Sequence, residues 1–174
     1  MIIYKDIFGG DEMISDAFDM TLSQDVVYEV DCKFITVGKG ADVDIGANAS
    51  AEEQAETLED GQESVNDVIF SFRLVQTSFD RKSYFAYLKG YMKRVKEHLT
   101  QNGASPEEIK AFEDGAKKFV ESRLTSQSFK DAQWEFYIGE SMDVNGMIVL
   151  LNYREDGKTP YMVFWKHGLK EEKV

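Results

Sequence analysis

Residues 78–124 read SFDRKSYFAYLKGYMKRVKEHLTQNGASPEEIKAFEDGAKKFVESRL, and this stretch decides the fold class. In its first half, large apolar residues recur three or four positions apart, which is the period of one buried helix face. They are Tyr84, Leu88, Tyr91, Val95 and Leu99. A second apolar face follows, made of Ile109, Phe112, Ala116, Phe119, Val120 and Leu124. We therefore predict two amphipathic helices in succession.

The residues between the two faces predict a tight connection. Asn102-Gly103 is typical of a helix C-terminus, where glycine readily takes the left-handed conformation. In Ser105-Pro106-Glu107-Glu108, serine can cap the second helix, proline suits its first position and Glu108 completes a capping box. So short a connection favours an antiparallel helical hairpin, which we place at residues 79–125.

Strand-like segments flank this hairpin on both sides. Upstream are residues 1–5, 26–37 and 65–75, which are rich in β-branched and aromatic residues. Downstream are residues 134–138, 147–153 and 161–165, and Asp156-Gly157 is a strong turn signal between the last two. Residues 9–16 are rich in turn formers, with a possible short helix. The order predicts one α+β domain, mainly β, over residues 1–174.

One long segment has a different composition. From Gly40 to Phe72 there are nine Asp or Glu and no Lys or Arg, so we expect residues 40–64 to form a flexible acidic loop. Oxygen-bearing side chains within Asp42–Glu53 approximate the spacing of an EF-hand. The glycine, however, occupies the fifth position instead of the sixth, and the preceding segment resembles a strand. Weak calcium binding is the most that this loop predicts.

Composition excludes several classes of protein. A single cysteine, Cys32, allows no internal disulfide and no four-cysteine zinc site, and we expect it to pack as a small apolar side chain. No apolar run is long enough to span a membrane, and the N-terminus lacks the order of a secretory signal. The net charge of −12 disfavours nucleic-acid binding. We expect a reduced, soluble, intracellular protein.

Against this acidic background, the first predicted helix is basic. Residues 80–99 contain six Lys or Arg and only two Asp or Glu. The six cations are Arg81, Lys82, Lys89, Lys93, Arg94 and Lys96. They form either an ordinary solvated face or a surface that attracts acidic partners, such as the acidic tails of tubulin.

Motifs of catalysis are missing from the sequence. It contains neither the glycine-rich phosphate-binding motifs nor a nucleophile elbow, and Glu12 and Glu140 are carboxylates with no visible acid or base partner. Carboxylates distant in sequence can still meet in a fold, but the pattern favours a protein that is not an enzyme.

Several long motifs resemble one known family. They are MIIYKDIF with DE and SD shortly after it, IGANASAEE at residues 45–53, TSFDRKSYFAYLKGYMK at residues 77–93 and FYIGESMDVNGMIVLLNYREDGKTPYM at residues 136–162. With the closing KHGL, these motifs run from end to end of the chain, and the sequence resembles the translationally controlled tumour protein family.

This resemblance implies a fold and a set of partners. The fold is a β-tent of small coiled sheets with a helical hairpin and a mobile acidic loop, similar to the zinc-containing chaperone of Rab GTPases. Because this chain lacks that chaperone's cysteines, no zinc is expected. The implied partners are calcium, tubulin or microtubules, small GTPases such as Rheb, and translation elongation factors. The implied location is the cytoplasm and in part the cytoskeleton.

The resemblance also implies site residues. The microtubule-binding region falls at about residues 81–123, which contains the basic helix. The GTPase-facing carboxylate corresponds to Glu12, with Glu140 as its expected neighbour. For calcium, the corresponding positions are Asn48 and Glu135.

Overall fold

The computed structural model describes residues 1–38, 43–44, 62–131 and 133–174 of the chain. Within this part, the strands on either side of the helices pair into one six-stranded antiparallel sheet with the order β3-β4-β11-β10-β9-β8. Its strands are β3 (Asp19–Ser23), β4 (Val27–Asp31), β8 (Val75–Thr77), β9 (Glu135–Ile138), β10 (Ile148–Tyr153) and β11 (Pro160–Trp165). The predicted hairpin at Asp156-Gly157 is confirmed, because β10 and β11 pair on either side of it, with Leu150 opposite Val163.

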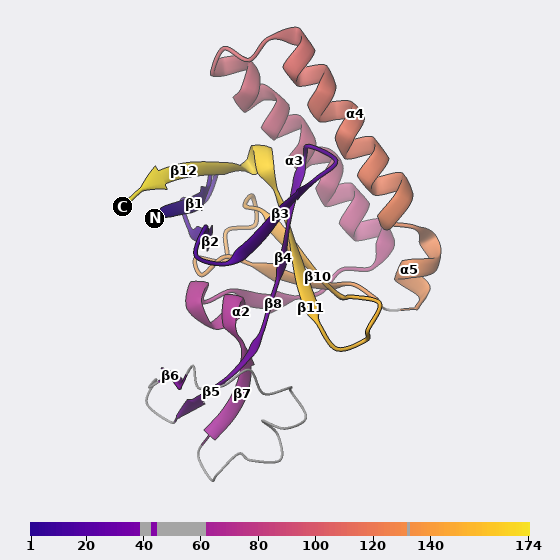
Figure 1. The fold of residues 1–174 in the computed structure, drawn as a ribbon. Coiled ribbons are helices and arrows are strands. Elements are labelled where there is room, and N and C mark those ends of the chain that lie inside the picture. Colours follow the sequence, from indigo (N-terminus) through magenta and orange to yellow (C-terminus); the bar gives the residue numbers. More distant parts are fainter. Residues whose placement is uncertain (39–42, 45–61, 132) are drawn as a thin grey trace.

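Two three-stranded sheets complete the described strands. The first joins the ends of the chain, because β1 (Ile2–Asp6) lies between β2 (Glu12–Ser15) and β12 (Leu169–Lys173). The second contains β5 (Phe34–Gly38), β6 (Val43–Asp44) and β7 (Gln62–Asn66). It lies at the end of the molecule opposite the helical hairpin (Figure 1).

The helical hairpin forms as predicted. It consists of α3 (Arg81–Gln101) and α4 (Pro106–Arg123), and a short helix, α5 (Ser126–Lys130), follows it. Asp80 caps α3 by accepting a hydrogen bond from Ser83 N at 2.7 Å, and Ser105 caps α4 by accepting one from Glu108 N at 3.2 Å. Both caps satisfy backbone N–H groups that the helix itself leaves free.

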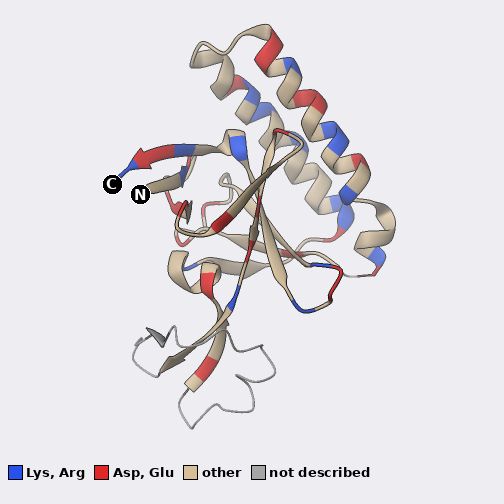
Figure 2. Cartoon of the chain, viewed as in Figure 1, with Lys and Arg blue, Asp and Glu red and all other residues tan. Residues whose placement is uncertain are grey.

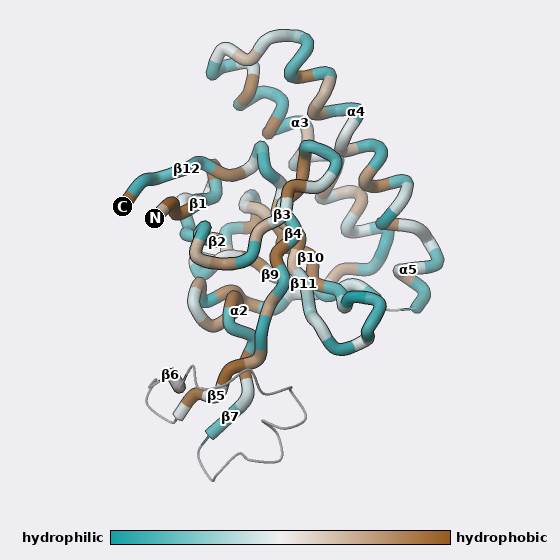
Figure 3. Tube along the Cα trace, in the orientation of Figure 1, coloured by the Kyte–Doolittle hydropathy of each residue, from teal (hydrophilic) through white to brown (hydrophobic). Residues whose placement is uncertain are grey.

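Aromatic contacts attach the hairpin to the central sheet. The ring of Phe119 on α4 lies 5.3 Å from that of Trp165 on β11, and the ring of Tyr84 on α3 lies 5.2 Å from that of Phe136 on β9. All four side chains are buried. Figure 3 shows hydrophobic residues concentrated in the central strands, whereas the hairpin alternates between hydrophobic and hydrophilic residues. The hairpin is therefore held by the apolar face that its sequence predicts.

The prediction of a continuous strand at residues 65–75 is wrong. The chain leaves β7 at Asn66, forms the helix α2 (Asp67–Phe72), and resumes as a strand only at β8. The reason is local, because Asn66 Oδ1 accepts hydrogen bonds from Val68 N at 2.9 Å and from Ile69 N at 3.1 Å. This cap outweighs the β-propensity of the apolar residues that follow.

Three further boundaries differ from the prediction. Residues 12–15 form β2 instead of a turn-rich segment, because they pair with β1. Residues 62–64, expected at the end of the acidic loop, belong to β7 and pair with β5. The rest of that loop, apart from β6, lies outside the described residues. The run predicted as one strand at residues 26–37 is two, β4 and β5, with a break at Cys32-Lys33.

Candidate functional site

A groove runs between α3 and α4 on the hairpin. Its volume is about 680 Å³, and we refer to it as the hairpin groove. Its apolar lining consists of Phe85, Leu88 and Met92 from α3 and Phe112, Ala116 and Val120 from α4. Its charged lining consists of Lys89, Lys93 and Lys96 from α3 and Glu113, Lys117 and Glu121 from α4.

Helical spacing explains how the apolar and charged residues separate. On α3 the apolar lining residues are three and four positions apart, and on α4 they are four apart, so each set forms a ridge along its helix. Leu88, Phe112 and Ala116 are buried, whereas Phe85, Met92 and Val120 are only partly buried. The groove therefore has an apolar floor that reaches the surface.

Three of the six predicted cations lie on one rim of this groove. Lys89, Lys93 and Lys96 are exposed and follow one another at intervals of four and three positions along α3. Lys96 Nζ pairs with Glu113 Oε1 of α4 at 2.7 Å, whereas Lys89 and Lys93 form no ion pair within the described part of the chain. Figure 2 shows Lys and Arg along both helices, with Asp and Glu interspersed mainly on α4.

The other three cations are not among the residues that line the groove. Arg94 is held against the body of the protein, because its Nη2 donates to Asn145 O at 3.0 Å and its guanidinium lies 5.4 Å from the Phe8 ring centre. Arg81 lies 5.1 Å from the ring centre of Phe85 at the start of α3, and Lys82 is exposed. Of the basic helix predicted from sequence, therefore, only half of the cations line the groove.

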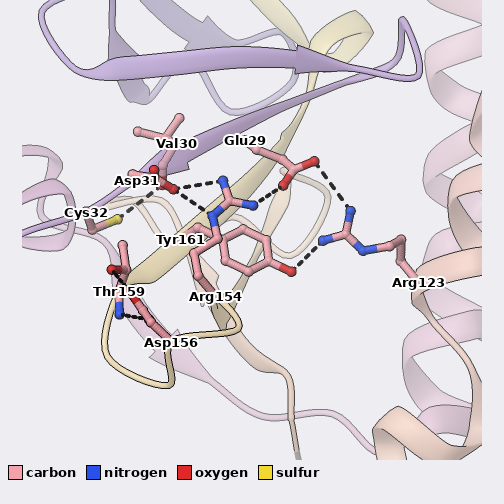
Figure 4. A network of polar contacts seen from close by, with 9 residues as sticks. All are labelled: Glu29, Val30, Asp31, Cys32, Arg123, Arg154, Asp156, Thr159 and Tyr161. Atoms are coloured by element: carbon pink, nitrogen blue, oxygen red, sulfur yellow. Dashed lines mark hydrogen bonds and ion pairs between the residues drawn. The ribbon is translucent and has the colours of Figure 1, made fainter.

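A buried ionic network fixes the base of the hairpin (Figure 4). Glu29 on β4 is 7% exposed and lies between two guanidinium groups, Arg123 of α4 at 3.4 Å and Arg154 of the β10–β11 turn at 2.7 Å. Arg154 also pairs with Asp31, and Arg123 donates a hydrogen bond to the hydroxyl of Tyr161. Burial alone would raise the pKa of Glu29, but the two arginines lower it below its usual value, so the carboxylate stays ionised.

Sequence reasoning missed this network. A signal was present, because Glu29 lies in a predicted strand between the apolar residues Tyr28 and Val30. A charged residue in such a run indicates a paired, buried charge. Its partners come from segments 94 and 125 positions away, however, and no local pattern identifies them.

The second candidate surface is an acidic edge, formed where the β1–β2 turn meets the turn between β9 and β10. Asp11 Oδ2 accepts hydrogen bonds from Ser141 N at 3.2 Å and from Ser141 Oγ at 2.6 Å. The neighbouring residues, Glu12 and Glu140, are both exposed, and Glu140 pairs with Arg73 at 3.1 Å. The fold thus brings the segments that carry Glu12 and Glu140 together, although they are far apart in sequence.

Buried polar contacts hold the two turns of this edge in place. Asp6 is 4% exposed and accepts hydrogen bonds from Phe8 N at 3.0 Å and from Met147 N at 2.8 Å. Burial raises the pKa of Asp6 despite these N–H donors. Tyr87 of α3 donates to Gly146 O and accepts from Ile148 N, so the same turn is also tied to the hairpin.

Comparison with known proteins gives the family. A family model described as translationally controlled tumour protein matches residues 1–170. The chain belongs to this family.

Its relatives match over the full length. The chain is 59% identical to a translationally-controlled tumor protein homolog of Debaryomyces hansenii and 60% identical to one of Gibberella zeae, with complete coverage of both chains in each case. Among solved structures, it is similar to the tumor-associated protein p23fyp of Schizosaccharomyces pombe, with 53% identity, a TM-score of 0.79 and complete coverage of both chains. The α+β fold class predicted from the sequence is therefore confirmed. The expected likeness to the Rab chaperone stays a prediction.

Of the two calcium-binding residues that the family resemblance implies, one lies within the described part of the chain. Asn48 lies outside the described residues. Glu135, at the start of β9, is partly buried, and its Oε1 accepts a hydrogen bond from Gln76 Nε2 at 3.2 Å. Among the described residues, no three His, Cys, Asp or Glu side chains gather as a metal site would require. Calcium binding by this member of the family stays a prediction.

Two other features bear on function. Cys32 is 3% exposed, and burial raises the pKa of its thiol to about 12, so the thiolate that would react is scarce. No helix within the described ranges has the length and hydropathy that crossing a bilayer would demand.

Proposed function

We propose that this chain is a non-enzymatic interaction protein of the cytoplasm that associates with microtubules through the hairpin groove. The observation that carries the proposal is the row of Lys89, Lys93 and Lys96 along one rim of an apolar groove. The outer surface of tubulin is strongly acidic, and a local positive surface on an otherwise acidic protein orients it toward such a partner.

The rigidity of the hairpin supports this role. Arg123, near the end of α4, is tied to Glu29 of the central sheet, and Tyr87 of α3 is tied to the β9–β10 turn. A surface held in this way loses little conformational entropy on binding, so more of the contact energy contributes to affinity.

Co-sedimentation with stabilised microtubules tests the proposal. We expect Lys89→Glu/Lys93→Glu to weaken binding by about tenfold or more, and added salt to weaken wild-type binding in the same direction. The matched control is Lys110→Glu/Lys118→Glu, which makes the same change in net charge at exposed positions of α4 outside the groove. Equal binding by both double variants, or salt-independent binding, would remove the groove from the mechanism.

A second candidate function is supported by the acidic edge. We propose that Glu12 and Glu140 face a small GTPase of the Rheb type, whose nucleotide release the chain assists, and that translation elongation factors are further partners. The contact between Asp11 and Ser141 favours this candidate, because it holds together the two segments that carry these exposed carboxylates.

Nucleotide release from a Rheb-like GTPase separates this candidate from the first. We expect wild type to accelerate release and Glu12→Ala to fold normally yet lose the acceleration. Glu155→Ala, at an exposed carboxylate on the β10–β11 turn, is the control and should behave like wild type. Release at its spontaneous rate in the presence of wild type would end the GTPase proposal and leave the microtubule proposal standing.

A further inference from the structure

The shape of the hairpin groove, in addition to its charge, indicates what kind of partner it fits. Its lining extends along α3 from Phe85 to Lys96, which is about 16 Å of helix at a rise of about 1.5 Å per residue. This length corresponds to about three helical turns. The apolar ridges of α3 and α4 run along the two sides of this length, so the groove is a trough between two helical ridges.

Such a trough fits a third helix. Helices pack by placing the side chains of one into the grooves of another. An amphipathic helix contacts an apolar groove through its residues at positions i, i+4 and i+7. The partly buried side chains of Phe85, Met92 and Val120 offer contacts for such a row. A disordered acidic peptide would reach the lysines but would leave this apolar floor in water.

The charges on the two rims indicate whether an acidic or a basic helix would bind. On the α4 rim, Lys117 lies 4.0 Å from Glu121, so that rim already contains both signs. On the α3 rim, Lys89 and Lys93 form no ion pair with the described residues. A basic helix would be repelled there, whereas acidic residues along one flank of an apolar stripe would pair with both lysines.

We propose that the hairpin groove binds an acidic amphipathic helix of about three turns from a partner protein, with the apolar stripe on Phe85, Met92 and Val120 and the acidic flank on Lys89 and Lys93. This inference rests on the proposed function, because it names the chemistry of the partner at the same surface. It predicts that a helix with an apolar face is bound in preference to an unstructured acidic tail.

Fluorescence anisotropy with a synthetic probe tests the inference. The probe is a labelled, stapled helix of about 15 residues, with leucines at i, i+4 and i+7 and glutamates along one flank. The comparison peptides are a scrambled sequence of the same composition and polyglutamate of the same length. We expect the amphipathic probe to bind at least about tenfold more tightly than either comparison peptide. Equal binding of all three peptides would overturn the inference.

Two variants locate the binding. Lys89→Glu/Lys93→Glu, at exposed positions, should weaken probe binding by about tenfold or more, and Met92→Glu should weaken it similarly by placing a charge on the floor. The control Lys110→Glu/Lys118→Glu should bind the probe within about twofold of wild type. Loss of affinity in the control equal to that in the groove variant would overturn the inference, as would full affinity in the groove variant.

The same proteins distinguish this inference from the proposed function. If wild type sediments with microtubules but does not prefer the amphipathic probe, the inference fails and the microtubule proposal stands. If it prefers the probe but does not sediment, the microtubule proposal fails and the groove is a receptor for acidic helices of other proteins. Because Met92 is partly buried, the circular dichroism melting curve of Met92→Glu is compared with that of wild type.

Discussion

Glu29 is the residue on which the attachment of the hairpin to the sheet depends. Its carboxylate is buried on β4 and is shared by Arg123 and Arg154, which approach from a helix and from a turn. Removing one partner of such a network leaves charged groups poorly paired, which is why buried ionic contacts are costly to break. The side chain therefore links the stability of the fold to the position of α4.

We expect Glu29→Gln to lower the free energy of unfolding by about 1.5–3 kcal/mol at neutral pH, the range for hydrogen bonds to charged groups. Since the arginines lower the pKa of Glu29 from its ordinary value of 4.5, the stabilisation is complete above that value and is lost as the pH falls through the lower, folded-state pKa. The difference between variant and wild type should thus shrink as the pH falls below that ordinary value. Urea unfolding at several pH values measures it.

Glu155→Gln is the control for this measurement, because Glu155 is exposed and adjoins Arg154 in sequence. Its effect should stay within about 0.5 kcal/mol at every pH. A constant difference between Glu29→Gln and wild type down to low pH would contradict the ionic role of Glu29.

Single residues also show how far sequence reasoning reached at the surface. Lys89, Lys93 and Lys96 have the spacing of one helix face, and in the structure they share a groove rim. Arg94 is adjacent to Lys93 in sequence, yet it projects in another direction and binds Asn145 O. Net charge alone could not separate the two, whereas helical geometry could have done so.

At the scale of elements, the glycines Gly115 and Gly90 in the two long helices differ in whether a Cβ atom would fit. A Cβ atom at Gly115 of α4 would lie 2.6 Å from Val26 Cγ1 and 2.9 Å from Gln24 O, so this glycine permits the β3–β4 turn to pack against the helix. At Gly90 of α3, the nearest such contact is Arg94 Nη1 at 3.6 Å, which is an ordinary van der Waals distance.

The same substitution should therefore act in opposite directions. We expect Gly115→Ala to destabilise the protein by about 1–3 kcal/mol through overpacking, and Gly90→Ala to stabilise it by about 0.5–1 kcal/mol through helix propensity. Thermal unfolding of the two variants beside wild type measures both effects. Stabilisation by Gly115→Ala would show that α4 does not pack against the turn in this way.

Elements were predictable where the signal was local. The caps and apolar spacing of α3 and α4 lie within their own sequence, and both helices were predicted close to their observed bounds. β12 was not predicted, because Leu169–Lys173 is largely charged and forms a strand only by pairing with β1. α2 was not predicted, because its residues have high β-propensity and the hydrogen bonds that Asn66 accepts from Val68 N and Ile69 N outweigh it.

At the scale of the whole molecule, the arrangement of elements explains why two surfaces could act separately. The lining of the hairpin groove comes from α3 and α4, whereas the acidic edge forms where the β1–β2 turn meets the β9–β10 turn. The fold class followed from the order of elements along the chain. The acidic edge depends on a contact between residues 130 positions apart, which no single stretch of sequence contains.

Hydrogen–deuterium exchange of the chain with and without saturating microtubules locates the bound surface most directly. We predict that exchange slows in the segments that line the groove, residues 85–96 of α3 and 112–121 of α4, and stays unchanged at residues 9–16 and 139–146. Slower exchange at the acidic edge with no change in the two helices would contradict the microtubule role of the hairpin groove. Exchange rates that are the same with and without microtubules in every segment would contradict it too.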